Sequence, residues 1–176
     1  ISLLPIDAIS VSRISHPRDR FHAGQFLPAL IRQIDTAAGR ITLTHKELLG
    51  TWSENAAMFA PCQTVPGIVR SVEEYGIFVE LAPNLAGLAE HRDDVNPGEG
   101  YSVYIKSITP ERMKIKLNLI DPIEPGNAEA APLQYFFPAS DHMTYWRYSP
   151  ESCPRRIETA FAKEEKPLRQ EEVRYC

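Results

Sequence analysis

Apolar and polar residues alternate along the middle of the chain, and the runs that show this best are 65–72, 77–81, 101–108 and 113–117. A period of two residues is typical of β-strands that bury one face. In the run 77–81, Ile77, Val79 and Leu81 form the apolar set, so Phe78 is predicted to point outward. A large aromatic side chain on the solvent-exposed face loses the stabilisation that burial of its ring would give. This indicates that it has a partner, such as a stacked base or a neighbouring loop.

The same alternation places a set of aromatic and basic side chains on the outer face. Val103, Ile105, Ile115 and Leu117 are predicted to point inward. The predicted outer set is Tyr75, Phe78, Tyr104, Lys106, Lys114 and Lys116. Aromatic rings interleaved with cations suit single-stranded nucleic acid, because each base offers a ring to stack on and each phosphate a charge to meet. An ordinary amphipathic sheet is the alternative, since exposed Lys and Tyr are common on strands.

Short motifs follow one another in the order Gly67-x-Val69, Tyr75-Gly76-Ile77-Phe78-Val79-Glu80-Leu81, Leu85-Ala86-Gly87-Leu88, Val103-x-Ile105-x-x-Ile108 and Lys114-Ile115-x-Leu117. In this order and at this spacing they resemble the S-one RNA-binding domain, named after the ribosomal protein that repeats it. The resemblance implies an oligonucleotide-binding (OB) barrel whose RNA face combines aromatic residues of the second strand with basic or polar residues of the third and fifth. It places the two aromatics of the family at Tyr75 and Phe78, and its basic residue at Lys114.

Two positions depart from the pattern of the family. Many members carry His after Gly-Leu-x, whereas this chain has Glu90 with His91 beside it, and the Asp that often ends the fourth strand is Thr109. His91 is retained as a candidate RNA contact. A carboxylate at position 90 repels phosphate, so we expect modest affinity.

Residues 1–44 resemble the second half of the same domain, with strands expected at 1–5, 26–35 and 40–44. The Asp and the basic residue of the family fall here on Asp35 and Arg40, which makes Arg40 a further candidate contact. Repetition at this spacing is typical of tandem barrels. Three strands of a five-stranded barrel leave open edges. Because the sequence opens on Ile1 instead of Met, we expect the natural gene to encode the two missing strands upstream.

The loop 10–22 is the most basic of the chain and contains Arg13, Arg18, Arg20, His16 and His22. It is interpreted either as a second RNA contact or as a solvated loop.

Residues 46–61 are predicted to form a helical linker with Ser53 capping its second turn. Its apolar residues, including Trp52, are expected to pack on the barrels and fix their relation. A stacking role for Trp52 is the alternative.

Beyond residue 121 the composition changes. Residues 122–132 are dominated by Pro, Gly, Ala and polar residues and are predicted to be a linker. The runs 133–137 and 143–148 are interpreted as a hairpin, and Ser149 as the start of a helix that presents Cys153, Ile157, Ala160 and Phe161 on one face. Residues 162–176 are predicted to be a solvated, charged tail. The aromatics of this region are assigned to a core, with a ligand platform as the alternative.

The charge balance limits how RNA would be held. The chain of 176 residues has a net charge of −4, and residues 65–121 contain six Lys or Arg against nine Asp or Glu. Binding must therefore depend on the local placement of basic residues and on stacking, and should be sensitive to salt.

The sequence holds three widely spaced cysteines, and its apolar runs are shorter than the roughly 18 residues of a membrane span. A cytoplasmic protein with no membrane association is the resulting prediction.

Catalytic and metal-binding patterns are weak. Neither a phosphate-cradling Gly-rich loop nor a nucleophile elbow is found, and His16, Asp19 and His22 lack a recognised metal spacing. We therefore expect no enzyme activity, no metal and no cofactor.

The first hypothesis for function is a bacterial protein that binds single-stranded RNA in translation or RNA metabolism, with ribosomal or RNA-processing proteins as partners. A protein-interaction module with weakened RNA binding is the second hypothesis, and the accessory end of an exoribonuclease is the third.

The predicted fold class is mostly β, with tandem five-stranded OB barrels of which the first is incomplete at its N-terminus. The predicted boundaries are 1–45 for the partial barrel, 46–61 for the linker, 62–121 for the complete barrel, 122–132 for a second linker and 133–176 for the C-terminal hairpin, helix and tail.

Overall fold

The computed structural model describes residues 1–124, 133–140 and 142–161. At its centre is a closed barrel of five strands, β4 (Thr64–Glu73), β5 (Gly76–Ala82), β6 (Leu85–Ala89), β7 (Gly100–Thr109) and β8 (Lys114–Pro122). The strand order is β4-β5-β6-β8-β7, and all neighbours are antiparallel except β6 and β8. The predicted five-stranded barrel is confirmed.

The barrel encloses the side chains that the alternation assigned to the inner face. The most deeply buried are Val69, Ile77, Val79, Val103, Ile105, Ile115 and Leu117, each at most 1% exposed. Burying one such side chain stabilises the fold by about 1.5–3 kcal/mol. The inward half of the predicted pattern is therefore confirmed.

A glycine sets the turn between β4 and β5. Gly76 has a φ of 150°, and a Cβ at this position would lie 2.6 Å from the carbonyl oxygen of Ala89. A side chain would collide with that backbone. The close approach holds the turn against the end of β6 and places Tyr75 at its tip.

The N-terminal region forms a separate sheet of β1 (Ser2–Leu3), β2 (Leu30–Asp35) and β3 (Arg40–Thr44) in the order β1-β3-β2. Strand β1 is parallel to β3, and β2 is antiparallel to it. Strands β6, β8 and β7 of the barrel have the same arrangement: β6 is parallel to the middle strand β8, and β7 is antiparallel to it. Strand 40–44 forms as predicted, whereas the other two are shorter than the expected 1–5 and 26–35.

Two short helical turns connect this sheet to the barrel, η3 (Lys46–Leu49) and α1 (Trp52–Ala56). Further short turns are η1 (Ile6–Ala8), η2 (Pro17–Asp19) and η4 (Pro110–Arg112). The cap of α1 is Thr51 and not Ser53, because the Glu54 N–H donates to Thr51 Oγ1 over 3.2 Å while the Thr51 N–H donates to Glu54 Oε2 over 2.7 Å. Trp52 is 3% exposed, so its predicted packing role is confirmed.

The C-terminal hairpin differs from the prediction. Its strands are β9 (Tyr145–Arg147) and β10 (Glu158–Ala160), which pair antiparallel. The segment 133–137 forms no strand, and instead the Phe136 N–H donates to the carbonyl of Leu48 over 2.8 Å. The predicted pairing was wrong because this segment hydrogen bonds to the backbone of Leu48 in the predicted linker 46–61, and the local sequence does not reveal this contact.

The helix predicted from Ser149 is also absent from the described part of this region. Ser149 Oγ accepts from the N–H of Ile157 over 2.7 Å, so the side chain closes the loop between β9 and β10 instead of capping a helix. Pro154 removes a donor and restricts the preceding residue, which opposes a regular helix here. Residues 125–132, most of the second predicted linker, and the predicted tail 162–176 lie outside the described residues.

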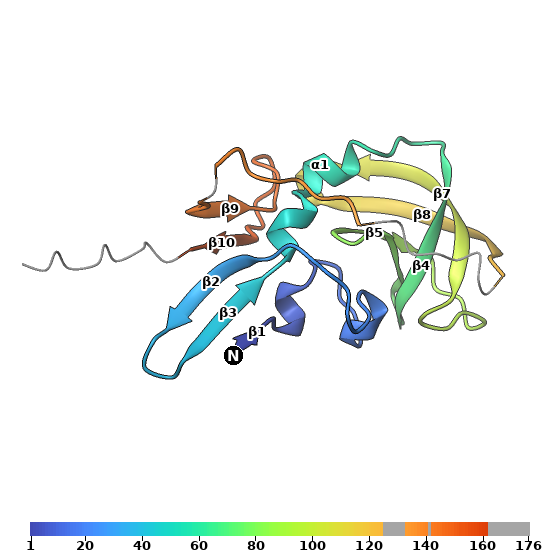
Figure 1. Cartoon of the computed structure of the whole chain (residues 1–176). Coiled ribbons are helices and arrows are strands. Elements are labelled where there is room, and N and C mark those ends of the chain that lie inside the picture. Colours follow the sequence, from blue (N-terminus) through green and yellow to red (C-terminus); the bar gives the residue numbers. More distant parts are fainter. Residues whose placement is uncertain (125–132, 141, 162–176) are drawn as a thin grey trace, which may run out of the picture.

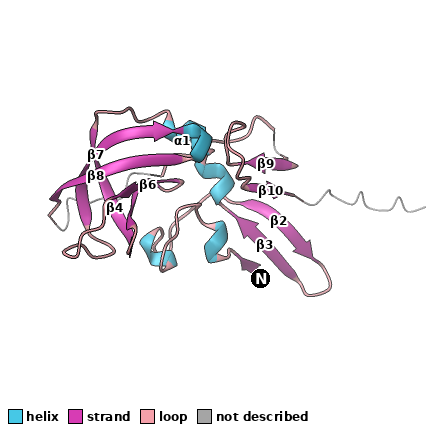
Figure 2. Cartoon of the chain, turned by 180° about the vertical axis from the view of Figure 1, so that it is seen from behind, coloured by secondary structure: helices cyan, strands magenta, loops and turns pink. Residues whose placement is uncertain are grey.

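The parts of the chain pack around α1. Figure 1 shows the barrel on one side, and the β1–β3 sheet and the β9–β10 hairpin on the other. Figure 2 shows the same arrangement from behind. The hairpin is attached through Tyr148, whose carbonyl accepts from the Trp52 N–H over 3.0 Å and whose hydroxyl donates to the carbonyl of Asn84. Trp146 and Tyr148 are buried, which confirms the core interpretation for these two. None of the described helices has the length and apolarity that crossing a membrane requires.

Candidate nucleic-acid interface

A groove lies on the barrel where the β4–β5 turn meets β6, β7 and β8. Its volume is about 260 Å³, and it is lined by Tyr75, Leu88, Ala89, Glu90, Lys106, Lys114, Lys116 and Leu117. Strand register explains this grouping, because β6 and β8 are neighbours and place Leu88 beside Lys116. Four residues of the predicted outer face, Tyr75 and the three lysines, thus share one groove.

A bulge in β7 controls where Lys106 lies. Ile105 pairs with Leu117 and Ser107 pairs with Lys116, so Lys106 is an extra residue in its strand. Bulges bend a strand and re-aim its side chains. The three-residue spacing from Ile105 to Ile108 is the sequence signal of this bulge, because strict alternation would have placed Ile108 on the outer face.

Of the two predicted aromatic residues, Tyr75 lines the groove and Phe78 lies against Tyr75 outside the groove lining. The rings of Tyr75 and Phe78 are 6.0 Å apart and meet edge to face. Tyr75 is 70% exposed, whereas Phe78 is half-buried and lies opposite Leu88 on β6. Phe78 therefore supports the Tyr75 side chain, most of which stays exposed.

The groove concentrates the positive charge of an acidic segment. Half of the six basic residues in 65–121 line it, namely Lys106, Lys114 and Lys116. One carboxylate accompanies them: Glu90 Oε1 lies 3.7 Å from Lys106 Nζ, and the two side chains are 87% and 43% exposed. An exposed pair at this distance is weak and leaves the groove with an excess of cations.

Three other predicted contacts lie outside the groove. Tyr104 does not line the groove, and the neighbouring Cys62 thiol raises the pKa of the tyrosine. His91 contacts the Glu73 carbonyl through Nδ1 at 2.7 Å and Asp93 Oδ1 through Nε2 at 2.9 Å, and the Asp93 carboxylate is the main cause of its raised pKa. Arg40 is exposed at the start of β3 in the N-terminal sheet.

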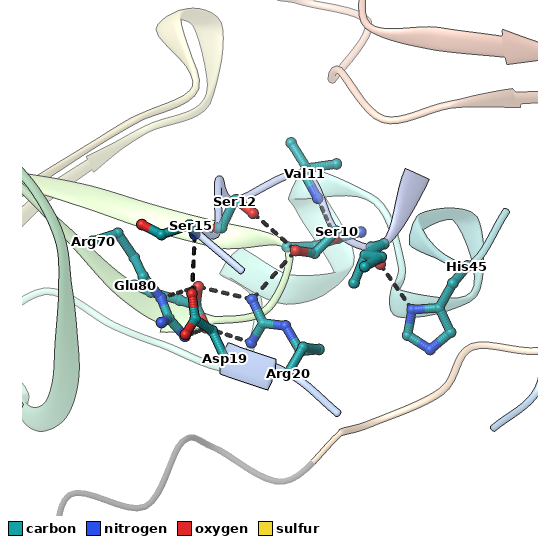
Figure 3. A network of polar contacts seen from close by, with 11 residues as sticks. Ser10, Val11, Ser12, Ser15, Asp19, Arg20, His45, Arg70 and Glu80 are labelled. Atoms are coloured by element: carbon teal, nitrogen blue, oxygen red, sulfur yellow. Dashed lines mark hydrogen bonds and ion pairs between the residues drawn. The ribbon is translucent and has the colours of Figure 1, made fainter. Parts of the chain in front are cut away.

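A buried ion cluster joins the N-terminal loop to the barrel and was not foreseen from the sequence (Figure 3). Glu80 accepts from Arg20 at 2.6 and 2.9 Å and from Arg70 at 2.9 and 3.1 Å. The Arg20 and Glu80 side chains are only 2% and 3% exposed. Glu80 shares the outward face of β5 with Phe78, and it is buried because the loop folds over it. Arg20 and Glu80 are 60 residues apart in the sequence, and no motif links them.

The basic loop 10–22 is therefore partly anchored. Arg20 is buried in the cluster and also donates to Ser10 Oγ at 3.3 Å, and His16 Nδ1 accepts from the Arg18 N–H at 3.1 Å. Arg13 and Arg18 remain exposed. Within the described ranges, no group of three or more His, Cys, Asp or Glu side chains is placed to hold a metal ion.

Comparisons with known proteins find distant relatives among ribosomal proteins. The chain is 29% identical over 121 residues to small ribosomal subunit protein bS1 of Chlamydia muridarum, a match that covers 62% of this chain and 21% of that protein. The bS1 proteins of Leuconostoc lactis and Rhizobium meliloti are 31% and 27% identical, with 66% and 69% of this chain and 30% and 24% of the relative covered. The matched segment thus spans between a fifth and a third of the length of these relatives.

No protein-family model matches the chain. Among solved structures, an uncharacterized protein from Methanocaldococcus jannaschii is similar over 43% of this chain and 97% of its own, with a TM-score of 0.32 and 22% identity. The fold and the sequence comparisons together define a protein that contains a closed OB-like barrel and is distantly similar to the bS1 proteins.

Proposed function

We propose that the groove on the barrel binds single-stranded RNA. The observation that carries this proposal is the convergence of an exposed aromatic ring, Tyr75, with Lys106, Lys114 and Lys116. A base stacks on the ring while the lysines meet the phosphates on either side of it. Duplex RNA hides its bases inside the helix, so a stacking site of this kind favours unpaired RNA.

The broader role follows from the comparisons and is part of the same proposal. The relatives are ribosomal subunit proteins, so a role in translation or RNA metabolism, with ribosomal or RNA-processing partners in the cytoplasm, is consistent with them. Catalysis is not part of the proposal. The RNA-binding residues proposed in the barrel are Tyr75, Phe78, Lys106, Lys114 and Lys116. Phe78 is included because it packs against Tyr75, whereas His91, Tyr104 and Arg40 lie outside the groove and are weaker candidates.

The N-terminal sheet is proposed to be the second half of another barrel. Its strand order and orientations match those of β6, β8 and β7. In the complete barrel β6 pairs with β5 and β7 pairs with β4, whereas the equivalent edges of β1 and β2 have no partner strand among the described residues. Ile31 and Ile34 are each more than half exposed and pair with Leu43 and Ile41, so these four side chains share one face, as expected of a core face that two further strands would cover. The predicted boundaries of 1–45 for the partial barrel and 62–121 for the complete barrel are part of this proposal.

Aromatic substitutions test the stacking site directly. Tyr75→Ala should weaken binding of a short single-stranded RNA by about 1–3 kcal/mol, which is the usual contribution of one stacked base, and Phe78→Ala should weaken it through the lost support of Tyr75. Fluorescence anisotropy measures the affinity, and circular dichroism checks that the barrel is intact. Phe26→Ala is the matched control, because Phe26 is 100% exposed and lies outside the barrel. Equal affinities for wild type and the Tyr75→Ala/Phe78→Ala variant would refute the stacking site.

A protein-docking role is the second candidate. The observation that favours it is Glu90, which pairs with Lys106 inside the groove and reduces the charge available to phosphate. In that case the affinity for RNA would be negligible from the start, and lysine substitutions would change only the binding of a protein partner. An RNA titration separates the two functions.

A further inference from the structure

Glu90 lies inside the proposed RNA-binding groove, where a carboxylate opposes phosphate binding. Its side chain is 87% exposed, and its partner Lys106 Nζ is 3.7 Å away, beyond hydrogen-bonding distance. No hydrogen bond to the Glu90 carboxylate from the described residues is found, so both oxygens are free to accept. An ionised carboxylate can only accept hydrogen bonds, and its two oxygens suit two adjacent N–H donors.

The bases of RNA differ in whether they offer such a pair of donors. Unpaired bases are read by hydrogen bonds to their Watson–Crick edges. Guanine presents N1–H and N2–H side by side, with the O6 acceptor next to them. Adenine and cytosine present one amino group beside a ring nitrogen that accepts, and uracil presents one N–H between two carbonyl oxygens. In these three bases an acceptor would face the carboxylate and repel it.

The neighbouring lysine completes the match. Lys106 lies next to Glu90, and its ammonium group has three N–H donors, so it can donate one to guanine O6 and another to a phosphate while the carboxylate accepts from N1–H and N2–H. Tyr75 lines the same groove and provides the ring on which the base stacks. The three side chains line one groove and provide a stacking surface, a donor and a double acceptor, which are the kinds of contact that one guanine requires.

We propose that Glu90 makes the groove selective for a guanine base in single-stranded RNA, with Lys106 as the second recognition residue. The inference depends on the proposed RNA-binding function and adds the base that the groove prefers. On this proposal the negative charge in the groove has a role, because it excludes phosphate from the position that the base edge occupies.

The test compares RNA oligonucleotides of about ten nucleotides that share a uridine background and differ in one central base, G, inosine, A or C. The wild type should bind the G oligonucleotide at least about five-fold more tightly than the A oligonucleotide. Inosine should bind less tightly than G, because it lacks the N2 amino group. Glu90→Ala should remove the preference and bind the A oligonucleotide more tightly than the wild type does, because a repulsive charge has been removed.

Glu151→Ala is the matched control, since it removes the same charge at an exposed position outside the groove. It should retain the preference for G. If wild type binds all four oligonucleotides equally, or if Glu90→Ala keeps the preference, the guanine inference is overturned while the RNA-binding function stands. If wild type binds none of them, both are overturned. Glu90→Gln provides a second variant, in which a neutral amide of the same shape should weaken the preference.

Discussion

The buried cluster of Arg20, Glu80 and Arg70 gives a sharp test of how the N-terminal loop is held on the barrel. The substitution is Glu80→Gln, which keeps the shape of the side chain and removes its charge. In the wild type the carboxylate accepts four hydrogen bonds, two from each arginine. The amide keeps one acceptor oxygen and turns a donor NH2 group toward two guanidinium groups.

The expected cost follows from the burial of the partners. The Arg20 side chain is 2% exposed, so its charge stays buried without a counterion after the substitution. Arg70 is 12% exposed and lies closer to solvent. Removing one partner of a buried ion pair typically costs about 3–5 kcal/mol, mainly because the remaining charge is left uncompensated. Arg20→Met should cost less, because Glu80 keeps its two bonds to Arg70.

Urea unfolding at pH 7, followed by circular dichroism, measures these differences. Arg18→Met is the matched control, because Arg18 is exposed on the same loop and its loss should change the free energy of unfolding by less than about 0.5 kcal/mol. The Arg20→Met/Glu80→Gln variant should lose less than the sum of the single variants, because the two residues are in contact. A change below about 1 kcal/mol for Glu80→Gln would show that the cluster does not anchor the loop, since that is the size of an ordinary substitution.

Two further predictions concern stability. Burial lowers the pKa of His45 from 6.5, so the unfolded chain binds a proton on this imidazole more readily than the folded chain does. The free energy of unfolding should therefore fall as the pH drops below about 6.5. Unfolding measured at several pH values should show a smaller fall for His45→Gln than for wild type. Gly76→Ala should lower the melting temperature, because its Cβ would lie 2.6 Å from the Ala89 carbonyl oxygen. The first prediction is contradicted if His45→Gln and wild type show the same pH dependence. The second is contradicted if Gly76→Ala has the melting temperature of wild type.

The barrel was predictable from the sequence because its determinants are local. Inward residues such as Val103 and Ile105 alternate with outward ones, and a strand of period two must bury one set. The groove followed in part: alternation placed Lys114 and Lys116 outward, but only strand register shows that they share a groove with Tyr75. Tyr104 satisfied the same pattern, yet it lies beside Cys62 and does not line the groove.

The errors arose where long-range contacts decided the structure. Ser149 has the local features of a helix cap, but its hydroxyl group accepts a bond from Ile157 across a loop. Glu80 has the local features of an exposed strand residue, but it is covered by Arg20 from a position 60 residues earlier. Neither partner is marked by a spacing or a motif, so sequence patterns alone do not identify them.

The salt dependence of RNA affinity tests most directly whether Lys106, Lys114 and Lys116 contact phosphates. The measurement is the logarithm of affinity for a short single-stranded RNA against the logarithm of salt concentration. It compares wild type with the Lys106→Gln/Lys114→Gln/Lys116→Gln variant and with a control variant in which Arg32, Arg155 and Arg156 are changed to Gln, because these arginines are exposed and lie outside the groove and the other candidate contacts. Each lysine that meets a phosphate contributes up to about 0.7 to the slope, so the lysine variant should lose up to about 2. The control should keep the slope of the wild type. A lysine variant with an unchanged slope would contradict phosphate binding in the groove.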